Sequence, residues 1–358
     1  MVVVFAGSRG IPYQSSYDRQ EYHLELTALS LKEKGHTVEV LTDPDYSSLS
    51  HYRGIRLHQV ANIWGKLWAI RNISEVNVIH LMQMDWLLAF GVKIFFPHIR
   101  IILEQTTSEI PSWKLTWSRH IIDEYITPRA DTQKYLNSFI TNPVHTVSRG
   151  IDIHLTKQNG HIKTWGLTRR KYLLFDTERG YSEKNLRLAL IAGYKSQLDY
   201  PFVVMGSIDP QFKHMFPQVT FTGPLQGNQE REMIANARFF IDTAPDKGDK
   251  HPLMLALGHA TPVLSHRDSV HMNLVNRHGL HYTKENISSF IHNMRFMEEA
   301  YSVLAQFAYD YAKEFRENHT VEGQVNKYIY IYVNAFVKEK QRQLAKESES
   351  SIFIPIQS

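Results

Sequence analysis

The sequence predicts an α/β protein made of two doubly wound domains, each built on a mostly parallel β-sheet. Three observations lead to this prediction. The chain has 358 residues, too many for one ordinary hydrophobic core but suited to two domains of roughly 150 to 200 residues. Short β-rich runs alternate with helical stretches, which is the pattern of βαβ units. The alternation stops once, in the polar stretch 153–170, and then starts again.

Seven runs in the first half of the chain are expected to be strands. They are almost continuously apolar, as strands must be when helices cover both faces of their sheet. Their ranges are 2–7, 36–42, 55–60, 76–82, 99–105, 124–129 and 144–150. A helix is expected over about 20–34, and Gly35 stops it, because glycine at this position ends helices.

A second alternating series follows the polar stretch. The expected strands are 171–177, 201–207, 219–223, 237–244, 261–266 and 279–282. Helices are expected in the gaps and from about 284 to 346. We therefore predict a first domain over 1–152, a linker over 153–170 and a second domain over 171–318. Two such domains would face each other across a cleft, where the carboxyl ends of the strands bind ligands. The fold alone does not determine which reaction a protein catalyses.

Composition excludes several classes of protein. The chain is 43% hydrophobic and 21% charged, and no apolar run approaches the roughly 20 residues that a spanning helix needs. MVVVFAGSRG has no basic residue before its apolar run, so it predicts a strand rather than a signal peptide. The absence of cysteine excludes disulfides and suits the cytoplasm. A net charge of +4 is too small to indicate nucleic acid, and the 19 histidines include no H-E-x-x-H spacing. We predict no metal site.

Two basic residues follow the first expected strand of the second domain. Arg179 and Lys184 are five positions apart in DTERGYSEKN. An arginine at a strand end and a lysine in the first turn of the next helix could converge on a diphosphate, because helix N-termini attract anions. The alternative is that both are solvated charges beside a helix start.

Six segments, in this order along the chain, resemble the family 4 glycosyltransferases, which have the GT-B fold. They are RGIP (9–12), KGHTVEVLT (34–42), TVSRGID (146–152), KYLLFDTERGYSEKN (171–185), the stretch from Gly223 to Ala260-Thr261-Pro262-Val263, and NHTVEGQVNKYIYIY (318–332). The resemblance covers roughly residues 1–335. It implies that a final helix, 319–346, crosses back onto the first domain and leaves a tail over 347–358.

The resemblance also implies an activity. Members transfer a sugar from a nucleoside diphosphate sugar, with retention and without an obligatory metal or other cofactor, to a glycan, lipid-linked or other acceptor. Arg179 and Lys184 would hold the diphosphate, residues 247–249 would face the sugar, and residues 261–263 would support the nucleotide. The donor-binding residues implied are Gly10, Arg179, Lys184, Gly223, Lys247, Gly248, Asp249, Thr261, Pro262 and Val263.

The chain departs from the family at its acidic and catalytic positions. Two glutamates of the family correspond to Lys247 and Leu255, which cannot accept hydrogen bonds. Asp249, or Asp246, could restore one carboxylate. The family's strand-end histidine corresponds to Gln105, and His80 is a second strand-end candidate. The catalytic candidates are His80, Gln105 and Asp249.

A Gly-Gly pair that lets the family's backbone approach the donor phosphate corresponds to Asp18-Arg19. Gly10 could still allow a close approach. Taken together, the departures leave three interpretations open: an enzyme with an altered site, a non-catalytic binding or scaffold protein that partners an active enzyme, and an epimerase of related form.

Two segments combine tryptophan with basic residues. Residues 62–72 contain Trp64 and Trp68, and residues 111–122 contain Trp113 and Trp117, with Lys and Arg in both segments. This composition is typical of helices that lie on an anionic membrane. The alternative is that the four tryptophans pack on the sheet. The first interpretation predicts a cytoplasmic protein that is peripheral at the inner face of the membrane.

Overall fold

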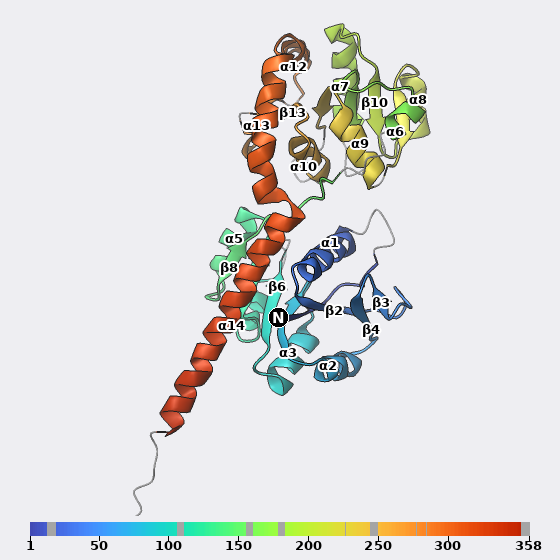
Figure 1. The fold of residues 1–358 in the computed structure, drawn as a ribbon. Helices are drawn as coiled ribbons and strands as arrows, with labels where there is room; N and C mark the ends of the chain where they lie inside the picture. The colour runs from blue at the N-terminus through green and yellow to red at the C-terminus, as the bar shows by residue number, and fades with distance from the viewer. Residues whose placement is uncertain are drawn as a thin grey trace, which may run out of the picture. The chain divides into compact units, whose positions relative to one another are not determined.

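The computed structural model describes residues 1–12, 19–105, 111–154, 160–177, 183–225, 227–243, 250–276, 278–283 and 285–351. The chain divides into two compact units. Unit 1 comprises Met1–Gly150 and Val321–Ser358, and unit 2 comprises Ile151–Thr320. Each unit contains a mainly parallel sheet with helices on both faces, so the predicted fold class is confirmed (Figure 1).

The sheet of unit 1 has the order β3-β4-β2-β1-β5-β6-β7-β8, and only β3 is antiparallel to its neighbour. Its strands are β1 (Val2–Ala6), β2 (Thr37–Thr42), β3 (His51–Tyr52), β4 (Ile55–Gln59), β5 (Val76–Leu81), β6 (Arg100–Glu104), β7 (Glu124–Thr127) and β8 (Val144–Thr146). Every expected strand forms within its predicted range. The sequence did not predict β3, because two residues are too few to show a period.

Helices cover both faces of this sheet. They are α1 (Arg19–Glu33), α2 (Ile63–Asn72), α3 (Trp86–Phe95), α4 (Ser112–Ser118), α5 (Ala130–Asn137) and α14 (Val321–Ser351). Apolar side chains of α1 and α14 pack in one core cluster with the sheet, and those of α2 to α5 pack in the other. This split follows from right-handed crossovers, because the chain leaves β1 toward one edge and later crosses to the other.

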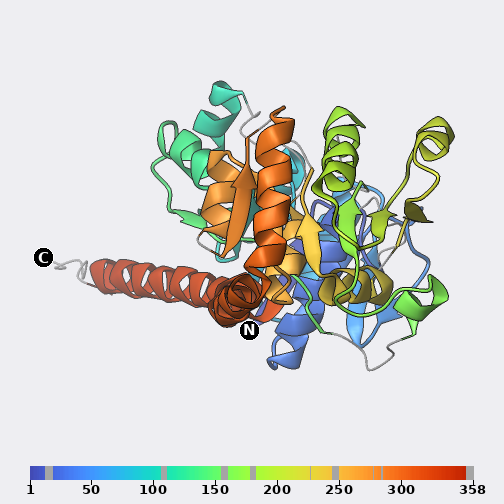
Figure 2. The same ribbon diagram turned by 90° about the horizontal axis from the view of Figure 1, so that it is seen from above.

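The sheet of unit 2 is entirely parallel and has the order β11-β10-β9-β12-β13-β14. Its strands are β9 (Leu173–Asp176), β10 (Phe202–Met205), β11 (Thr220–Gly223), β12 (Phe239–Ile241), β13 (Val263–His266) and β14 (Gly279–Tyr282). Its helices are α6 (His161–Thr164), α7 (Glu183–Ser196), α8 (Pro210–Met215), α9 (Asn228–Asn236), α10 (His251–Gly258), α11 (Ser269–Val275), α12 (Ile287–Glu299) and α13 (Tyr301–His319). The strands lie between a layer with α7 and α12 and a layer with α9 and α10 (Figure 2).

Residues 153–154 and 160–170, the described part of the predicted linker over 153–170, belong to unit 2. Ile162 of α6 and Leu167 are buried in the core of unit 2. The side chain of Arg170 donates to the carbonyl of Ala237 at 2.6 Å. Ile162 and Leu167 thus anchor a segment that is otherwise mostly polar and exposed. Unit 2 begins at Ile151, whose N–H donates to His319 O at 2.8 Å, so the outgoing and returning chains meet there.

The last helix, α14, belongs to unit 1 and begins after a break at Thr320. Val325, Tyr328, Ile331 and Tyr332 are buried against the unit 1 sheet and α1. Across the described residues, no helix combines the length and the apolar character needed to cross a membrane.

Candidate functional site

The strand order of unit 2 reverses between β9 and β12. From β9 the chain builds β10 and β11 toward one edge, and from β12 it builds β13 and β14 toward the other. In an open parallel sheet, the crevice for a ligand lies at the carboxyl ends of the strands where the order reverses. Asp176 ends β9 there and Thr177 follows it, and Asp242 and Thr243 follow β12. The backbone topology therefore places the candidate site at these residues.

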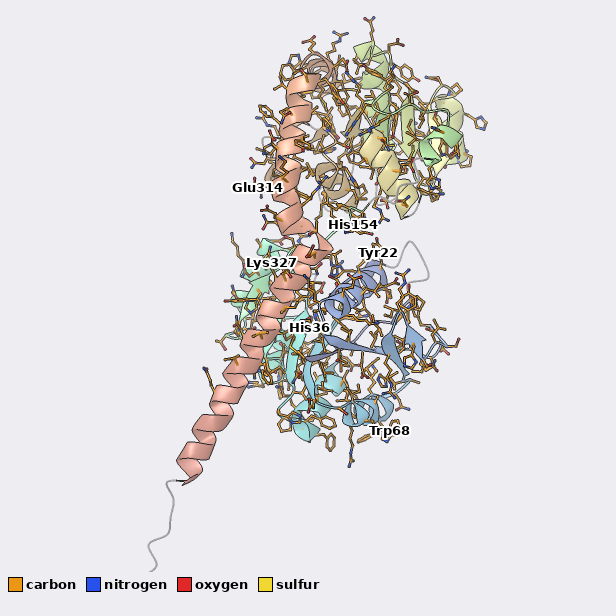
Figure 3. All side chains as sticks on the ribbon, viewed as in Figure 1. Tyr22, His36, Trp68, His154, Glu314 and Lys327 are labelled. Atoms are coloured by element: carbon orange, nitrogen blue, oxygen red, sulfur yellow. The ribbon has the colours of Figure 1, made fainter. Side chains whose placement is uncertain are left out.

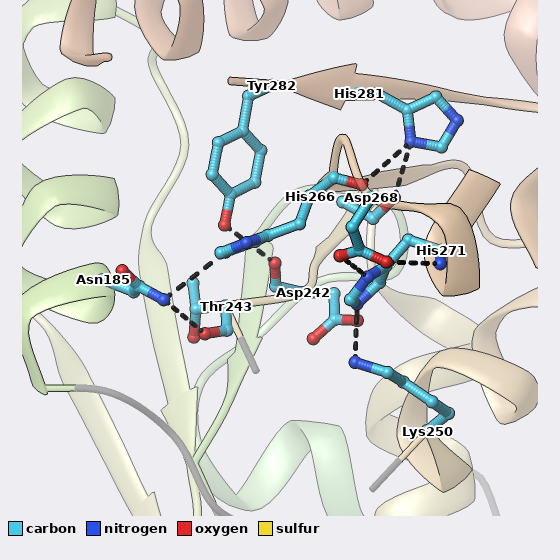
Figure 4. Close-up of polar contacts among 10 residues, drawn as sticks. Asn185, Asp242, Thr243, Lys250, His266, Asp268, His271, His281 and Tyr282 are labelled. Atoms are coloured by element: carbon cyan, nitrogen blue, oxygen red, sulfur yellow. Dashed lines mark hydrogen bonds and ion pairs between the residues drawn. The ribbon is translucent and has the colours of Figure 1, made fainter. Parts of the chain in front are cut away.

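Two carboxylates, an imidazole and a lysine meet at this edge (Figure 4). His271 is fully buried. Its Nε2 lies 2.9 Å from Asp242 Oδ2, and its Nδ1 contacts Asp268 Oδ2. Lys250 Nζ lies 2.7 Å from the same Nε2. The two aspartates thus hold the ring from both sides, and the ammonium group offsets part of their negative charge.

Each of these four residues comes from a different position in the fold. Asp242 follows β12, Asp268 lies in the turn after β13, His271 is in α11, and Lys250 directly precedes α10. Asp268 Oδ1 also accepts from the His271 N–H at 3.0 Å, as a capping aspartate does. Burial opposes ionisation of Asp268, but the hydrogen bonds and charge of His271 outweigh it and lower the pKa of this carboxyl.

A second group of polar side chains adjoins this one. Asn185, in the first turn of α7, donates to Thr243 O at 3.3 Å and lies 3.4 Å from His266 Nε2. Tyr282 OH donates to Asp242 O at 3.1 Å, and its ring packs edge-on against His266. Burial, and next the nearby His271, lower the pKa of His266. We conclude that His266 is a neutral imidazole at pH 7.

Thr243 carries a hydroxyl that has no hydrogen-bond partner within the described part of the chain. The residue is fully buried, and Oγ1 is the unpartnered atom. A buried hydroxyl without a partner is unfavourable by about 1–3 kcal/mol. Because it lies at the switch point, directly after Asp242, this hydroxyl is suited to bind a polar ligand.

The structure places some of the predicted donor-binding residues at this edge. Lys184 lies in the first turn of α7 beside Asn185. Its exposed side chain forms an ion pair with Glu285 at 2.9 Å. Gly223 ends β11 at the same edge of the sheet with a φ of 71°, which favours glycine. Arg179, Lys247, Gly248 and Asp249 lie outside the described residues.

Thr261, Pro262 and Val263 are at the opposite end of β13. Val263 is the first residue of that strand, so it lies roughly 10 Å from the strand's carboxyl end. Thr261 Oγ1 donates to Ile234 O at 2.9 Å, and Pro262 O accepts from Phe240 N at 3.0 Å. All three are buried. Their resemblance to the family therefore reflects packing of the sheet, and we do not assign them to the ligand.

Leu255, at the position of the family's second glutamate, is 1% exposed and packs in the core of unit 2. It therefore cannot contact the hydroxyls of a ligand.

His80 is not positioned for catalysis in unit 1. This residue of β5 is fully buried, and its Nδ1 lies 2.5 Å from Tyr332 OH of α14. It therefore attaches the last helix to the sheet, which corrects its selection as a catalytic candidate. Gln105, directly after β6, is also buried, and its N–H donates to Ile126 O at 2.7 Å.

A buried polar network surrounds His80. Glu104 contacts Arg149 Nη2 at 3.1 Å and accepts from Tyr328 OH at 2.9 Å, while Gln324 Nε2 lies 2.8 Å from His23 Nε2. Burial lowers the pKa of His23 and of His80 to about 4. Burial would raise the pKa of Glu104, but Arg149 and the two histidines outweigh it and lower this pKa to about 2. Through Tyr328 and Gln324, this network joins α14 to β6 and α1.

Packing alone explains why residue 10 is a glycine. Its φ is 128°, and a Cβ atom there would lie 2.4 Å from Thr42 Cγ2. No other residue fits this position without moving Thr42.

The sequence did not predict eight described residues of the site: Asn185, Asp242, Thr243, Lys250, His266, Asp268, His271 and Tyr282. A signal was present, since polar residues directly follow apolar strand runs in FFIDT and VLSHRD. The rule that ligands meet strand ends would have selected Asp242, His266 and Asp268. Only the tertiary structure brings Asn185 and His271 to them.

Comparisons with known proteins identify the fold. No family model matches the sequence, and no curated protein does. Among solved structures, a glycosyltransferase from Rickettsia africae ESF-5 is similar over 93% of this chain and 98% of its own, with a TM-score of 0.73 and 12% identity. Anabaena Alr3699/HepE in complex with UDP and glucose is similar over 93% and 99%, with a TM-score of 0.66 and 12% identity.

The catalytic domain of Starch Synthase IV from Arabidopsis thaliana, bound to ADP and acarbose, is similar over 94% of this chain and 99% of its own, with a TM-score of 0.63 and 13% identity. These likenesses extend over both units. The chain therefore has the GT-B fold of these glycosyltransferases.

Proposed function

We propose that this protein is a glycosyltransferase that takes its sugar from a nucleoside diphosphate sugar. The observation that carries the proposal is the likeness of nearly the whole chain to glycosyltransferase structures, two of which hold UDP or ADP. The strand-order reversal in unit 2 supports it independently, because such a reversal creates the crevice where nucleotides bind.

The donor's diphosphate would lie at the N-terminus of α7. This helix of 14 residues begins at Glu183, and the N-terminus of a helix attracts an anion. Lys184 is exposed beside this end and would exchange its ion pair with Glu285 for the phosphate. Arg179 would add a second cation, as the resemblance implies. The Thr243 hydroxyl would find its missing partner on the donor.

The cluster of Asp242, Asp268, His271 and Lys250 has a positioning role in this proposal. It joins the segments after β12 and β13, which lie on one side of the proposed donor. A site of this kind works by holding the donor in place, so rigid loops contribute directly to the rate. From the resemblance, we further propose transfer with retention, no metal or cofactor beyond the donor, and a glycan or lipid-linked acceptor.

A second candidate function is nucleotide-sugar binding without transfer, in a protein that partners an active enzyme. Two observations favour it. Leu255 is apolar and buried where the family has a glutamate, and Lys184 already has an acidic partner. Both functions require donor binding, and only the first requires turnover.

Donor binding is tested by calorimetric titration with UDP, ADP and their glucose conjugates. We expect Lys184→Ala to weaken the bound nucleotide by about tenfold, because a charge-assisted hydrogen bond to phosphate is lost. Lys195→Ala is the matched control, since it removes an exposed lysine from the other end of α7. Glu285→Gln should keep or raise the affinity, because it frees Lys184.

Failure of every nucleotide to bind at millimolar concentration would contradict both candidate functions. Turnover separates them: hydrolysis or transfer of a labelled sugar, unaffected by EDTA, supports the transferase. Tight binding with no release of the sugar over hours supports the binding protein.

A further inference from the structure

Three consecutive helices of unit 1 lie on the same face of its sheet. Leu67 of α2, Leu88 of α3 and Leu115 of α4 are buried in one core cluster. α2 and α3 are in close contact, because a Cβ atom on Gly91 of α3 would lie 2.9 Å from Leu67 Cδ1. The sides of the three helices that face away from this core therefore face the same way.

The outer side of α2 carries two tryptophans. Trp64 is 69% exposed and Trp68 is 70% exposed, although tryptophan usually buries most of its surface. Figure 3 shows Trp68 on the side of α2 away from the sheet. Arg71 is exposed on the same stripe, at the spacing i, i+4, i+7 from Trp64. The alternative that these tryptophans pack on the sheet is wrong.

The outer side of α3 is apolar as well. Leu87, Phe90, Ile94 and Phe95 are all more than half exposed. Their spacing of i, i+3, i+7 and i+8 puts them on one stripe. The sequence alone does not mark this helix as exposed, because its apolar residues suit a buried helix equally well. On α4, Trp113 is 63% exposed and Trp117 is 70% exposed.

The outer apolar face therefore comprises Trp64, Trp68, Leu87, Phe90, Ile94, Phe95, Trp113 and Trp117. An exposed surface with this many large apolar residues marks a site for a partner or a membrane.

The charges on this face have one sign. The sequences of α2, α3 and α4 contain four basic residues and no acidic one. Lys66 and Lys93 are paired with aspartates outside the helices. Arg71 is exposed, Arg119 is exposed directly after α4, and Lys114 Nζ lies 5.4 Å from the centre of the Trp113 ring. Cations therefore border the apolar residues.

We propose that the outer apolar face binds the surface of an anionic lipid membrane. Tryptophan prefers the level of the headgroups, and basic side chains beside it pair with anionic lipids. The helices would lie in the plane of the membrane, because α2 and α3 have 10 residues each and are only about 15 Å long.

Charge complementarity selects lipid over a second copy of the chain. Arg71, Lys114 and Arg119 border the face, and they would meet like charges if the face met its own copy. An anionic bilayer supplies the opposite charge along the whole border. This proposal goes beyond the proposed transferase activity and does not depend on it.

Vesicle binding by the full chain tests the proposal. Wild-type protein should co-sediment with mixed phosphatidylcholine and phosphatidylglycerol vesicles at least about tenfold better than with phosphatidylcholine alone. Added salt should weaken the binding. Four of the 6 tryptophans lie on the outer apolar face. Their fluorescence should therefore shift to the blue when vesicles are added, and brominated lipid should quench it.

The variants test whether vesicle binding depends on the outer apolar face or on exposed apolar residues in general. Trp64→Ser with Trp68→Ser, and separately Leu87→Gln with Phe90→Gln, should reduce binding at least about tenfold, because each pair removes large apolar area from the interface. Phe307→Ser with Tyr309→Ser is the matched control, since these exposed aromatic residues belong to α13 of unit 2. All pairs should melt like the wild type, because the side chains are exposed.

Three results would overturn the proposal. Wild-type protein could fail to bind mixed vesicles at low salt, or both face variants could bind as well as the control. Ultracentrifugation could instead show a wild-type dimer that the face variants lose, which would make the face a contact between copies. Nucleotide affinity, measured on the same variants, should be unchanged, so failure here is distinct from failure of the transferase proposal.

Discussion

Glu104 is a buried carboxylate that pairs with the partly exposed Arg149, and two histidines are its neighbours. Removing one partner of such a pair would leave a buried charge without compensation. Both histidines are neutral at pH 7, because burial lowers the pKa of His23 and of His80 to about 4. At the residue scale, the attachment of α14 therefore depends on protonation.

We expect the free energy of unfolding of unit 1 to fall as the pH falls from about 6.5 toward 4. The two histidines bind protons in the unfolded chain near pH 6.5 but only near pH 4 in the folded one. Their stabilising effect is complete above the unfolded pKa and is lost as the pH falls toward the folded pKa. The loss is about 1.4 kcal/mol per pH unit for each histidine. Glu104 contributes its own loss only below about pH 4.5.

Urea denaturation at several pH values measures this effect. Tryptophan fluorescence reports mainly on unit 1, which contains all tryptophans except Trp165. The His80→Gln variant should have a lower free energy of unfolding at pH 7. This free energy should also change less with pH, because the variant takes up about one proton fewer when it unfolds. An unchanged slope in this variant would contradict the assignment.

At the scale of elements, the edge strand β14 positions the candidate site. Tyr282 in this strand contacts Asp242, and His281 Nδ1 lies 3.0 Å from Ser265 Oγ (Figure 4). The strand can reach β13 only because its first residue is glycine. Gly279 pairs with Val263, and a Cβ atom there would lie 2.7 Å from Val263 O and 2.5 Å from Val275 Cγ1.

We expect Gly279→Ala to destabilise unit 2. The added methyl group meets a backbone carbonyl, which cannot move without disturbing the β13–β14 pairing. Overpacking of this kind costs about 1–3 kcal/mol, which lowers Tm by about 2–4 °C per kcal/mol in a unit of this size. Gly160→Ala is the control, because nothing lies within 4 Å of a Cβ atom there. Thermal melts that do not distinguish the two variants would contradict the packing argument.

At the scale of the whole molecule, the chain ends in the unit where it began. Residues 1–150 and 321–358 form unit 1, with residues 151–320 folded between them. The core of unit 1 includes Val325, Tyr328, Ile331, Tyr332 and Ala335 of α14. Unit 1 is therefore complete only when the last helix is present.

Removal of residues 321–358 should unfold unit 1 and leave unit 2 folded. Each large buried side chain of α14 contributes about 1.5–3 kcal/mol, so together they match the ~5–15 kcal/mol of a typical domain. Hydrogen exchange followed by mass spectrometry should show loss of protection in β1, β5 and β6 with retention in β9 and β12. Removal of 352–358 alone is the control, and equal protection in both truncated chains would refute the prediction.

The order of the strands along the chain, apart from β3, was determined by the sequence alone. Continuous apolar runs mark buried strands such as β1 and β9. A strand whose sheet is covered on both faces is buried along its length, so its own residues must be apolar. The collinear motifs led to the GT-B fold, and the solved structures agree. Lys184 was also placed correctly at the start of a helix.

Only the tertiary structure decided which side chains meet and which remain exposed. It buried His80 beneath α14, although the sequence made it a candidate for catalysis, and it exposed Trp64 and Trp68. It also joined Asp242 to His271, 29 residues apart. The spacing of apolar residues shows which side of a helix or strand is buried against the neighbouring elements. The meeting of distant segments depends instead on strand order and on the return of α14, which no local pattern contains.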